Sequence, residues 1–495
     1  MHILLIGNDF HFEMENVCRL FLPQEKIITL YDIWDDGSFE DLTVTGILEK
    51  GETDTRITVR LHFDTVDETV SDTVSNTHEA YQDNCELTMT TLLYHRLVSL
   101  LGVSQDWGLV TGVRPVKLLR RLTAAKGIEA ARAHFRERLL VSEPKLALSE
   151  RVLRVENKIL SLSRPDSFSL YVSIPFCPTR CDYCSFVSQT VTQAEKLIPA
   201  YVDCLEKELA YTGDMARALG LRLETVYFGG GTPTTLSPEQ LSRLFTVIEQ
   251  HFDLSHLREY TVEAGRPDTV TEEKLRTIRS AGIDRVSINP QTLQNAVLKN
   301  IGRRHTAEQF MEAFSLARRC GLPNINTDLI AGLPGDTVEG FSKTMDGILD
   351  LDPESVTVHT LCLKRASNLV LQQRADYETS QPAAKMIAMA GKRLSATEYL
   401  PYYLYRQSRA VSNQENTGWA KPGNEGLYNV YIMDETHTII GCGAGAVTKL
   451  KVPDSDQLSR IFNYKFPYEY IARFEEMIAR KEQVIKFYEQ LNTNS

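Results

Sequence analysis

The 495-residue sequence lacks any apolar run long enough to cross a membrane. Its longest runs, such as 1–7 and 97–103, fall well short of the roughly 20 residues that a spanning helix needs. The opening stretch, MHILLIGNDFHFEMEN, lacks a basic segment before its apolar part and soon reaches acidic side chains, unlike a secretory signal. We therefore expect a cytoplasmic protein with no membrane span.

The sequence also lacks an excess of basic residues. Its 54 Lys and Arg residues are outnumbered by 65 Asp and Glu residues, which gives a formal net charge of −11. A large nucleic-acid interface needs clustered Lys and Arg to displace counterions, so we expect no nucleic-acid partner. A local basic pocket for an anionic small molecule is compatible with this balance.

The nine cysteines do not indicate a disulfide framework, because their number is odd and no export signal accompanies them. Cys177, Cys181 and Cys184 fall within eight residues, in the stretch YVSIPFCPTRCDYCSF. A tetrahedral structural zinc site would need a fourth ligand, but no second C-x2-C pair supplies one and Phe186 follows. The spacing favours three corners of a 4Fe–4S cluster with one open iron; structural zinc and a thiol-redox pair at Cys181 and Cys184 are the alternatives.

Four regions differ in their pattern of apolar residues. We expect a small α/β domain at 1–80, a helical segment at 81–165, a core at 166–392 and a C-terminal α+β domain at 393–495. In the core, six short apolar runs are each followed by a helical pattern: SLYVSIP, ETVYFGG, EYTVEAG, DRVSINP, INTDLIAG and SVTVHTL. Six such units predict a parallel sheet with right-handed crossovers. The periodicity does not distinguish a curled sheet from an open one.

The unusual residues of the core come directly after the predicted strands, where ligands of parallel sheets collect. In chain order, they are the cysteine cluster, the stretch FGGGTPT, Glu263, Gln291, Asp328, and the pair Lys364 and Arg365. Carboxylates at such an edge can hold ribose hydroxyls, and Arg303 can hold a carboxylate.

The three glycines of FGGGTPT would let the backbone approach a ligand closely and expose its N–H and C=O groups. A glycine-rich turn after a strand also occurs for structural reasons alone. The stretch lacks the G-K-[ST] ending of a phosphate-binding loop, which argues against hydrolysis of a nucleoside triphosphate.

At these residues the sequence resembles the radical S-adenosylmethionine (SAM) enzymes, and within them the oxygen-independent coproporphyrinogen III oxidase (coproporphyrinogen dehydrogenase) family, which includes a haem chaperone. The resemblance spans about 167–448 and is carried by YVSIPFCPTRCDYCSF, FGGGTPT, SINPQTLQNAVLKNIGRRHT and NTDLIAGLPGDT. The first 160 residues, with TGVRP, resemble the longer, firmicute-style members. The implied fold is a partial (β/α)6 TIM-like barrel, with an N-terminal α/β and helical extension and a C-terminal α+β domain that covers the substrate side.

The resemblance also implies a role for each site residue. Cys177, Cys181 and Cys184 would bind a 4Fe–4S cluster whose open iron chelates SAM. Residues expected at SAM are Tyr171 beside the cluster, Gly230, Gly231 and Thr232 at the methionine end, Arg303 at the carboxylate, Glu263, Gln291 and Asp328 at the ribose, and Cys362 near the adenine. No catalytic residue is expected beyond the cluster and the SAM site.

The implied reaction is anaerobic and belongs to haem biosynthesis. A 5′-deoxyadenosyl radical would remove a hydrogen from a propionate of coproporphyrinogen III, and loss of carbon dioxide and one electron would leave a vinyl group. Two such steps give protoporphyrinogen IX. The implied partners are this tetrapyrrole, an electron donor for the cluster and an electron acceptor that the sequence does not identify. Arg266, Lys364 and Arg365 are candidate anchors for the substrate carboxylates.

Two positions depart from the best-known oxidases of the family. Those oxidases often carry His where this chain has Ser173, and a fourth Cys where it has Phe186. A Phe at the latter position also occurs in the haem-chaperone branch. The alternative functions are therefore a haem chaperone and a radical SAM enzyme that acts on another tetrapyrrole.

Overall fold

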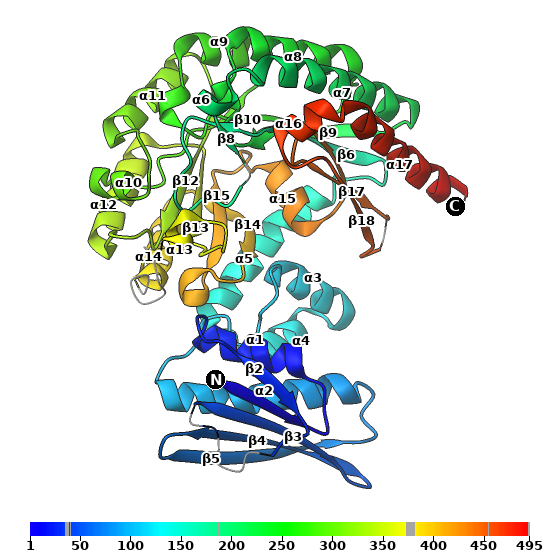
Figure 1. Cartoon of the computed structure of the whole chain (residues 1–495), viewed down its shortest axis with the longest axis vertical. Coiled ribbons are helices and arrows are strands. Elements are labelled where there is room, and N and C mark those ends of the chain that lie inside the picture. The colour runs from blue at the N-terminus through cyan, green and yellow to red at the C-terminus, as the bar shows by residue number, and fades with distance from the viewer. Residues whose placement is uncertain (35–38, 40, 187, 373–381, 454, 494–495) are drawn as a thin grey trace. The chain divides into compact units, whose positions relative to one another are not determined.

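The computed structural model describes residues 1–34, 39, 41–186, 188–372, 382–453 and 455–493. The chain forms two compact units (Figure 1). Unit 1 comprises 1–150 with 406–409, and unit 2 comprises 151–405 with 410–495. None of the helices in the described residues combines the length and the apolar character that crossing a membrane requires.

Unit 1 contains a five-stranded sheet with the strand order β2-β1-β3-β4-β5. β1 is parallel to β2 and β3, and β3, β4 and β5 form an antiparallel meander. The strands are β1 (His2–Ile6), β2 (Ile28–Tyr31), β3 (Thr43–Lys50), β4 (Asp54–Phe63) and β5 (Val66–Ser75). α1 (His11–Phe21) and α2 (Tyr81–Leu101) share the apolar core of this sheet through residues such as Met14 and Met89.

The expected boundary at residue 80 therefore separates α2 from the sheet on which it packs. The later elements of unit 1 are α3 (Pro115–Lys126), α4 (Ile128–Ala133) and a π-helical turn (His134–Arg138). α5 (Glu143–Leu160) begins in unit 1 and ends in unit 2.

Unit 2 is built on a sheet whose six central strands are parallel neighbours in chain order. They are β6 (Ser167–Ile174), β9 (Arg222–Gly230), β10 (Glu259–Glu263), β11 (Arg285–Ser287), β12 (Asn324–Ala331) and β13 (Ser355–Thr360). These strands are the six that the sequence predicted, and the fold class is confirmed. In β6 the residues of both faces are almost all buried, as expected for a parallel sheet covered on both sides.

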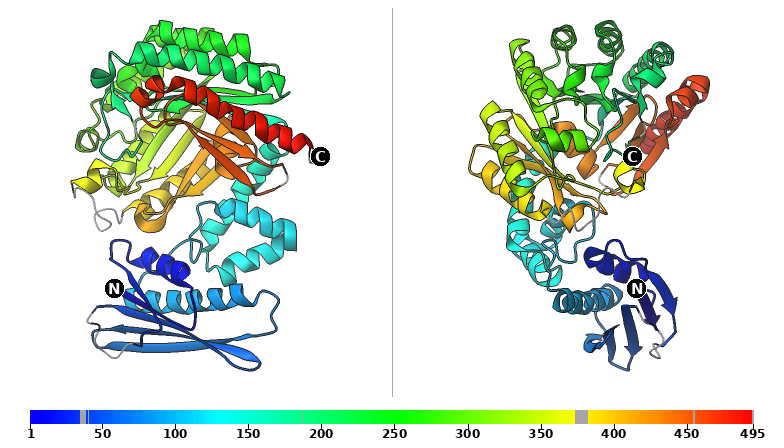
Figure 2. Two further views of the ribbon diagram at one scale, coloured as in Figure 1. Left: turned by 45° about the vertical axis from the view of Figure 1, so that its right-hand side comes forward. Right: turned by 60° about the vertical axis from the view of Figure 1, so that its left-hand side comes forward.

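A helix follows each central strand and covers the outer face of the sheet (Figures 1 and 2). These helices are α7 (Ile198–Ala218), α8 (Pro238–His251), α9 (Glu272–Ser280), α11 (Ala307–Arg319), α12 (Val338–Leu351) and α14 (Ala383–Ser395). Their starts are encoded locally. Ser237 with Gln240 and Thr306 with Gln309 form capping boxes, which satisfy backbone N–H groups at the starts of α8 and α11.

The C-terminal region extends both edges of this sheet instead of forming a separate layer over it. β16 (Thr438–Cys442) pairs with β6 and continues to β17 (Val447–Lys451) and β18 (Leu458–Phe462). At the other edge, β15 (Glu415–Ala420) pairs with β13 and neighbours β14 (Leu400–Arg406). Within the described residues β14 and β18 do not meet, so the sheet is open. The domain boundary at 393–495 stays a prediction, and the strands of this region pair with the core sheet because the edges of that sheet offer unpaired backbone groups.

Shorter elements connect this framework. They are β7 (Phe176–Cys177), β8 (Gln189–Thr190), α6 (Val191–Ala194), α10 (Asn295–Asn300), α13 (Asn368–Leu371), α15 (Leu427–Asp434), α16 (Pro467–Ala472), α17 (Phe474–Thr493), and 3-10 turns at Pro233–Thr235, Pro267–Thr269 and Val411–Asn413.

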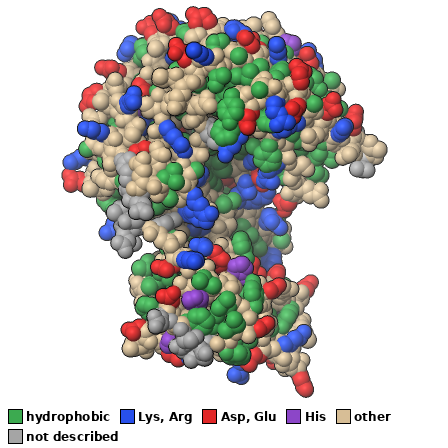
Figure 3. Space-filling model, viewed as in Figure 1, with side chains coloured by type: hydrophobic (Ala, Val, Ile, Leu, Met, Phe, Trp, Pro, Cys, Tyr) green, Lys and Arg blue, Asp and Glu red, His purple; other side chains and the backbone are tan. Residues whose placement is uncertain are grey.

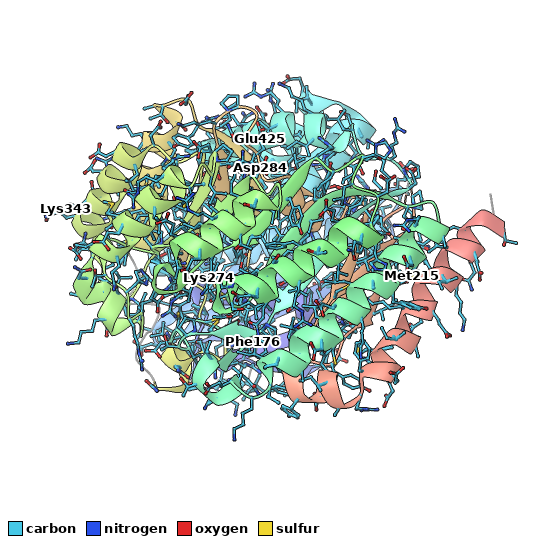
Figure 4. The ribbon with its side chains drawn as sticks, turned by 90° about the horizontal axis from the view of Figure 1, so that it is seen from above. Phe176, Met215, Lys274, Asp284, Lys343 and Glu425 are labelled. Atoms are coloured by element: carbon cyan, nitrogen blue, oxygen red, sulfur yellow. The ribbon has the colours of Figure 1, made fainter. Side chains whose placement is uncertain are left out.

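The view from above separates the two ends of the strands (Figure 4). Phe176, which follows β6, lies on one side, whereas Asp284, which precedes β11, lies on the other side with Glu425. The residues that follow the strands therefore gather at one edge of the sheet.

Candidate functional site

The carboxyl ends of the central strands enclose a cleft of about 320 Å³ in unit 2. The space-filling view shows unit 2 hollowed beneath its arch of helices (Figure 3). Most of the predicted cofactor and metal residues line the cleft: Cys177, Cys181, Cys184, Gly230, Gly231, Thr232, Glu263, Arg303 and Asp328. Tyr171, Gln291 and Cys362 are absent from its lining.

The three predicted cluster ligands lie on a loop that starts at β7, and β7 pairs with β8 on the far side of the loop. Burial raises the pKa of the Cys177 thiol, and it raises the pKa of the Cys184 thiol to about 11. Thiols bind metals as thiolates. A raised pKa disfavours the thiolate, so these buried thiols would give up their protons when a bound metal stabilises the negative charge on sulfur.

The three thiols line one cleft. Among the described residues, no three His, Cys, Asp or Glu side chains gather tightly enough to hold one metal ion. A zinc ion needs four ligands around one centre, whereas the iron atoms of a cubane are separate and its thiolates stand apart.

Arg266 holds the cysteine loop. The side chain is only 3% exposed, pairs with Asp268 at 3.0 Å, and donates to the carbonyl and hydroxyl oxygens of Thr179 at 3.1 Å each. Its Nη1 also lies 3.6 Å from Cys181 Sγ. The expectation that Arg266 anchors a substrate carboxylate was therefore wrong, because its donors are already used inside the protein.

The glycine turn after β9 packs directly against the same loop. The Gly231 and Thr232 N–H groups donate to the carbonyl oxygens of Ile174 (2.8 Å) and Phe176 (2.7 Å). A Cβ at Gly231 would lie 2.5 Å from Phe176 O, and Gly230 has a φ of 103°, which only glycine adopts readily. These two N–H groups therefore position the cysteine loop.

The pKa values of two carboxyl groups in the cleft are shifted in opposite directions. Burial, with a further contribution from the charge of Asp328, raises the pKa of Glu263 to about 7, although the Tyr227 hydroxyl donates to Glu263 at 2.5 Å. Burial also raises the pKa of Asp328, but His359, Asn326 and Thr357 outweigh burial and hold that pKa below its ordinary value. Asp328 is therefore ionised at neutral pH, whereas Glu263 is partly protonated.

Gln291 lies beside this pair in a strained backbone. Its φ is 69°, its N–H donates to Asp328 O at 3.0 Å, and its carbonyl oxygen accepts from the Ile330 N–H at 3.0 Å. The side chain is only 7% exposed, and its Oε1 has no hydrogen-bond partner among the described residues. Buried unsatisfied groups and left-handed backbones concentrate at functional sites.

Arg303 connects the cysteine loop to the ends of β10 and β11. It donates to the carbonyl oxygens of Gly265 (3.1 Å) and Asn289 (2.9 Å) and to the Tyr183 hydroxyl (2.9 Å). The guanidinium lines the cleft and brings a fixed positive charge to it.

The two other predicted residues, Tyr171 and Cys362, are not among the residues that line the cleft. The Tyr171 ring stacks on Tyr428, with centroids 6.0 Å apart, and Tyr428 stacks on Tyr227 at 4.4 Å. Cys362 forms an isolated backbone bridge with Ala410.

Several residues that line the cleft were missed from the sequence: Tyr183, Tyr227, Asn289, Asn326, Thr357, His359, Tyr403 and Tyr405. Asn326 is the centre of their polar network, because it donates to both Ser287 Oγ and Asp328 Oδ1 at 2.8 Å. Side chains alternate between the two faces of a strand, so residues two apart, such as Asn326 and Asp328, share one face. This alternation is the sequence signal that could have identified Asn326.

At the rim, Phe186 is 65% exposed, and the Lys364 Nζ lies 5.8 Å from the centre of its ring. Ser173, by contrast, is buried behind the site. Its hydroxyl donates to Ala444 O at 2.8 Å, and its carbonyl oxygen accepts from the Tyr201 hydroxyl at 2.8 Å. Of the two departures, Phe186 therefore faces the cleft and Ser173 contacts the C-terminal region.

Comparisons with known proteins agree on one superfamily. The profile of the Radical SAM superfamily matches residues 171–348. The oxygen-independent coproporphyrinogen-III oxidase-like protein HemZ of Bacillus subtilis is 39% identical over 396 residues, which cover 79% of this chain and 78% of HemZ. The heme chaperone HemW of the same organism is 32% identical over 283 residues, which cover 56% of this chain and 70% of HemW.

A solved structure shares the fold. The coproporphyrinogen III oxidase HemN from Escherichia coli, described as a radical SAM enzyme, is 22% identical with a TM-score of 0.51, and the match covers 65% of this chain and 72% of HemN.

Proposed function

Because the chain belongs to the oxygen-independent coproporphyrinogen III oxidase family of the radical SAM superfamily, we propose that it converts two propionates of coproporphyrinogen III to vinyl groups. The product would be protoporphyrinogen IX, formed without oxygen. The observation that carries the proposal is the cleft itself, in which three thiols without a fourth share one cavity with Glu263, Arg303 and Asp328.

The family implies a 4Fe–4S cluster and SAM, and the residues present suit both. Cys177, Cys181 and Cys184 would hold the cluster. Together, cluster and SAM supply a carbon radical that removes a hydrogen atom from the substrate. The proposed SAM residues are Tyr171, Gly230, Gly231, Thr232, Glu263, Gln291, Arg303, Asp328 and Cys362.

Charge and protonation assign different tasks to these residues. Asp328, ionised at neutral pH, accepts hydrogen bonds from ribose hydroxyls, and Arg303 offers a cation to a carboxylate. Gln291 presents an unused carbonyl oxygen close to Asp328. Tyr171, Tyr227 and Tyr428 form a stacked wall that keeps water from a reactive carbon centre.

The rim is the proposed binding place of the tetrapyrrole. Its four rings need apolar surface, which Phe186, Tyr403 and Tyr405 supply, and its carboxylates need cations, which Lys364 and Arg365 supply. The reaction also needs a protein that donates electrons to the cluster and an acceptor for the electron released with each carbon dioxide.

A haem chaperone is the second candidate function. The observation that favours it is Phe186, which faces the cleft where the best-known oxidases carry Cys. A radical SAM enzyme for another tetrapyrrole would use the same cofactor residues.

One anaerobic experiment separates these functions. The reconstituted, reduced protein is incubated with SAM and coproporphyrinogen III, and both 5′-deoxyadenosine and protoporphyrin are quantified. The oxidase produces both compounds, with two deoxyadenosines for each molecule of product. Deoxyadenosine without a vinyl product would point to another substrate, and stable haem binding without turnover would point to a chaperone.

A further inference from the structure

A second cleft, of about 540 Å³, borders the cofactor site and shares Thr179, Arg180 and Arg303 with it. One side of this cleft is the cysteine loop at 178–180, and the other includes Lys299 at the end of α10 and Arg304 just beyond it. We call this surface the basic groove. Everything that lines it belongs to unit 2.

The basic groove concentrates positive charge on an acidic chain. Arg180, Lys299 and Arg304 are exposed, whereas the whole protein has a net charge of −11. Arg180 is oriented by a 2.8 Å hydrogen bond to Ala366 O. Neither Lys299 nor Arg304 forms an ion pair with a described carboxylate, so their charges are available to a partner.

The carboxylates beside the groove already have partners: Asp268 pairs with Arg266 at 3.0 Å, and Asp182 accepts a hydrogen bond. Asp182 lies 3.4 Å from where a Cβ at Gly302 would stand, and its Oδ1 accepts a hydrogen bond from Asn368 at 3.1 Å. Three exposed cations against these engaged carboxylates leave the groove positive.

The chemistry of the lining argues against the tetrapyrrole as its occupant. Besides the cations, the groove presents Pro178, threonines and Gly302, without an aromatic or large aliphatic side chain. Sites for flat apolar ligands are mostly hydrophobic, and the aromatic side chains that such a ligand needs, the tyrosines and Phe186, line the cofactor cleft instead. Exposed cations on a polar surface are instead suited to a complementary protein surface, which they attract over a distance.

The groove also lies next to the metal ligands. Pro178 follows Cys177 and Arg180 precedes Cys181, so a partner in the groove would touch the backbone between two cysteines. Arg266 ties this backbone to Cys181 through its contacts with Thr179 O and the Cys181 sulfur.

We propose that the basic groove docks an acidic one-electron carrier protein that reduces the iron–sulfur cluster. This inference rests on the proposed function, which requires a reduced cluster. The carrier loses one electron and the cluster gains it, with no proton or group transferred. Complexes for electron transfer are small and short-lived, with interfaces below about 1,200 Å², so a groove with a few charges is sufficient.

The test uses the reconstituted full-length protein and, as the probe, a reduced flavodoxin of net negative charge. The variant K299E/R304E reverses two charges of the groove. The matched control is R276E/K343E, which makes the same charge change on α9 and α12, where both residues are about two-thirds exposed (Lys343 is marked in Figure 4). Cluster reduction is followed by stopped-flow absorption without oxygen, and flavodoxin binding to the cluster-free protein is measured by titration.

We expect K299E/R304E to slow reduction by the flavodoxin about tenfold or more at low salt and to weaken binding in parallel. High salt should shrink the difference, because the charges are exposed and screened. The rate of reduction by dithionite and the absorption of the cluster should be the same in K299E/R304E as in the wild type. The control variant R276E/K343E should be reduced by the flavodoxin at the wild-type rate.

An unchanged flavodoxin rate, or an equal loss in R276E/K343E, would overturn the docking site. So would a loss of dithionite reduction, which would place the effect in the cluster loop, or a selective loss of coproporphyrinogen III binding, which would make the groove a substrate site. Failure of the wild-type protein to form any cluster would instead refute the proposed function, so the two failures are distinguishable.

Discussion

At the scale of single residues, several polar side chains of the site already have partners within the protein. Arg266 is occupied by Asp268 and Thr179, and Thr232 Oγ1 lies 3.5 Å from Cys177 Sγ. Both residues follow central strands, as the other candidate site residues do. Position after a strand therefore identified the neighbourhood of the site without identifying the task of each residue.

The first prediction concerns the thiols. Replacement Cys184→Ala removes one of three proposed cluster ligands, so reconstituted iron and SAM cleavage should each fall at least tenfold, as even changes behind metal ligands cost 10–100-fold. Iron content, visible absorption and 5′-deoxyadenosine are measured. Cys320→Ala, at the end of α11 outside the cleft, is the control and should behave as the wild type. A full cluster spectrum in Cys184→Ala would refute the cluster assignment.

The second prediction concerns Glu263, whose pKa of about 7 lies above the ordinary value of 4.5. Between these pH values the folded protein holds a proton that the unfolded chain has lost, so this group makes stability fall as pH rises toward 7. Glu263→Gln keeps an acceptor for Tyr227 and removes the titration.

The cofactor-free Glu263→Gln variant should therefore melt higher than the wild type at pH 8, by about 2 °C or more, and no higher at pH 4.5. Thermal unfolding across this range is the measurement. Asp328, with its lowered pKa, contributes the opposite slope at acidic pH in both proteins, below the range in which Glu263 loses its proton. A constant difference between the two melting curves across the range would contradict this account.

At the scale of elements, the cysteine loop is held by backbone contacts as much as by side chains. The turn after β9 donates two N–H groups to 174–176, and β8 pairs with β7. The position of the three thiols therefore depends on the glycine turn, because that turn holds the loop that carries them.

The third prediction follows from this contact. A Cβ in Gly231→Ala would meet backbone atoms of Ile174 and Phe176 at 2.5–2.8 Å, which flexible side chains cannot relieve. Such overpacking costs about 1–3 kcal/mol, and the displaced loop should bind less iron. Chemical denaturation and iron content test this. Gly112→Ala, with nothing within 4 Å of the added atom, should leave both unchanged. Wild-type values for Gly231→Ala would show that the loop is not seated on this turn.

At the scale of the whole molecule, the C-terminal strands and helices complete the core sheet of unit 2 through a buried charged network. Lys481 on α17 lies 3.1 Å from Glu208 on α7, and both side chains are buried. Glu208 also accepts from the Gly443 N–H at 2.7 Å and the Tyr470 hydroxyl at 2.6 Å. One carboxylate therefore joins α7, α16, α17 and the turn after β16.

The fourth prediction is that Lys481→Met destabilises the protein by about 3–5 kcal/mol, because Glu208 becomes a buried charge without its cation. Urea denaturation measures the loss. Lys486→Met, an exposed position on the same helix, should cost little. Adding Glu208→Gln to Lys481→Met should recover part of the stability. If the single Lys481→Met change were neutral, the ion pair would not be what secures α17.

The sequence by itself determined the six parallel strand and helix units, because local periodicity and helix caps such as Ser237 and Thr306 are properties of short segments. It also determined which three thiols share a loop and that the chain belongs to the radical SAM superfamily. Only the tertiary structure decided what each polar side chain faces. It assigned Arg266 to the cysteine loop, joined Asn326 to Asp328, and added the C-terminal strands to both edges of the sheet. These outcomes depend on contacts between residues far apart in the chain, and on hydrogen bonds and burial that no local pattern encodes.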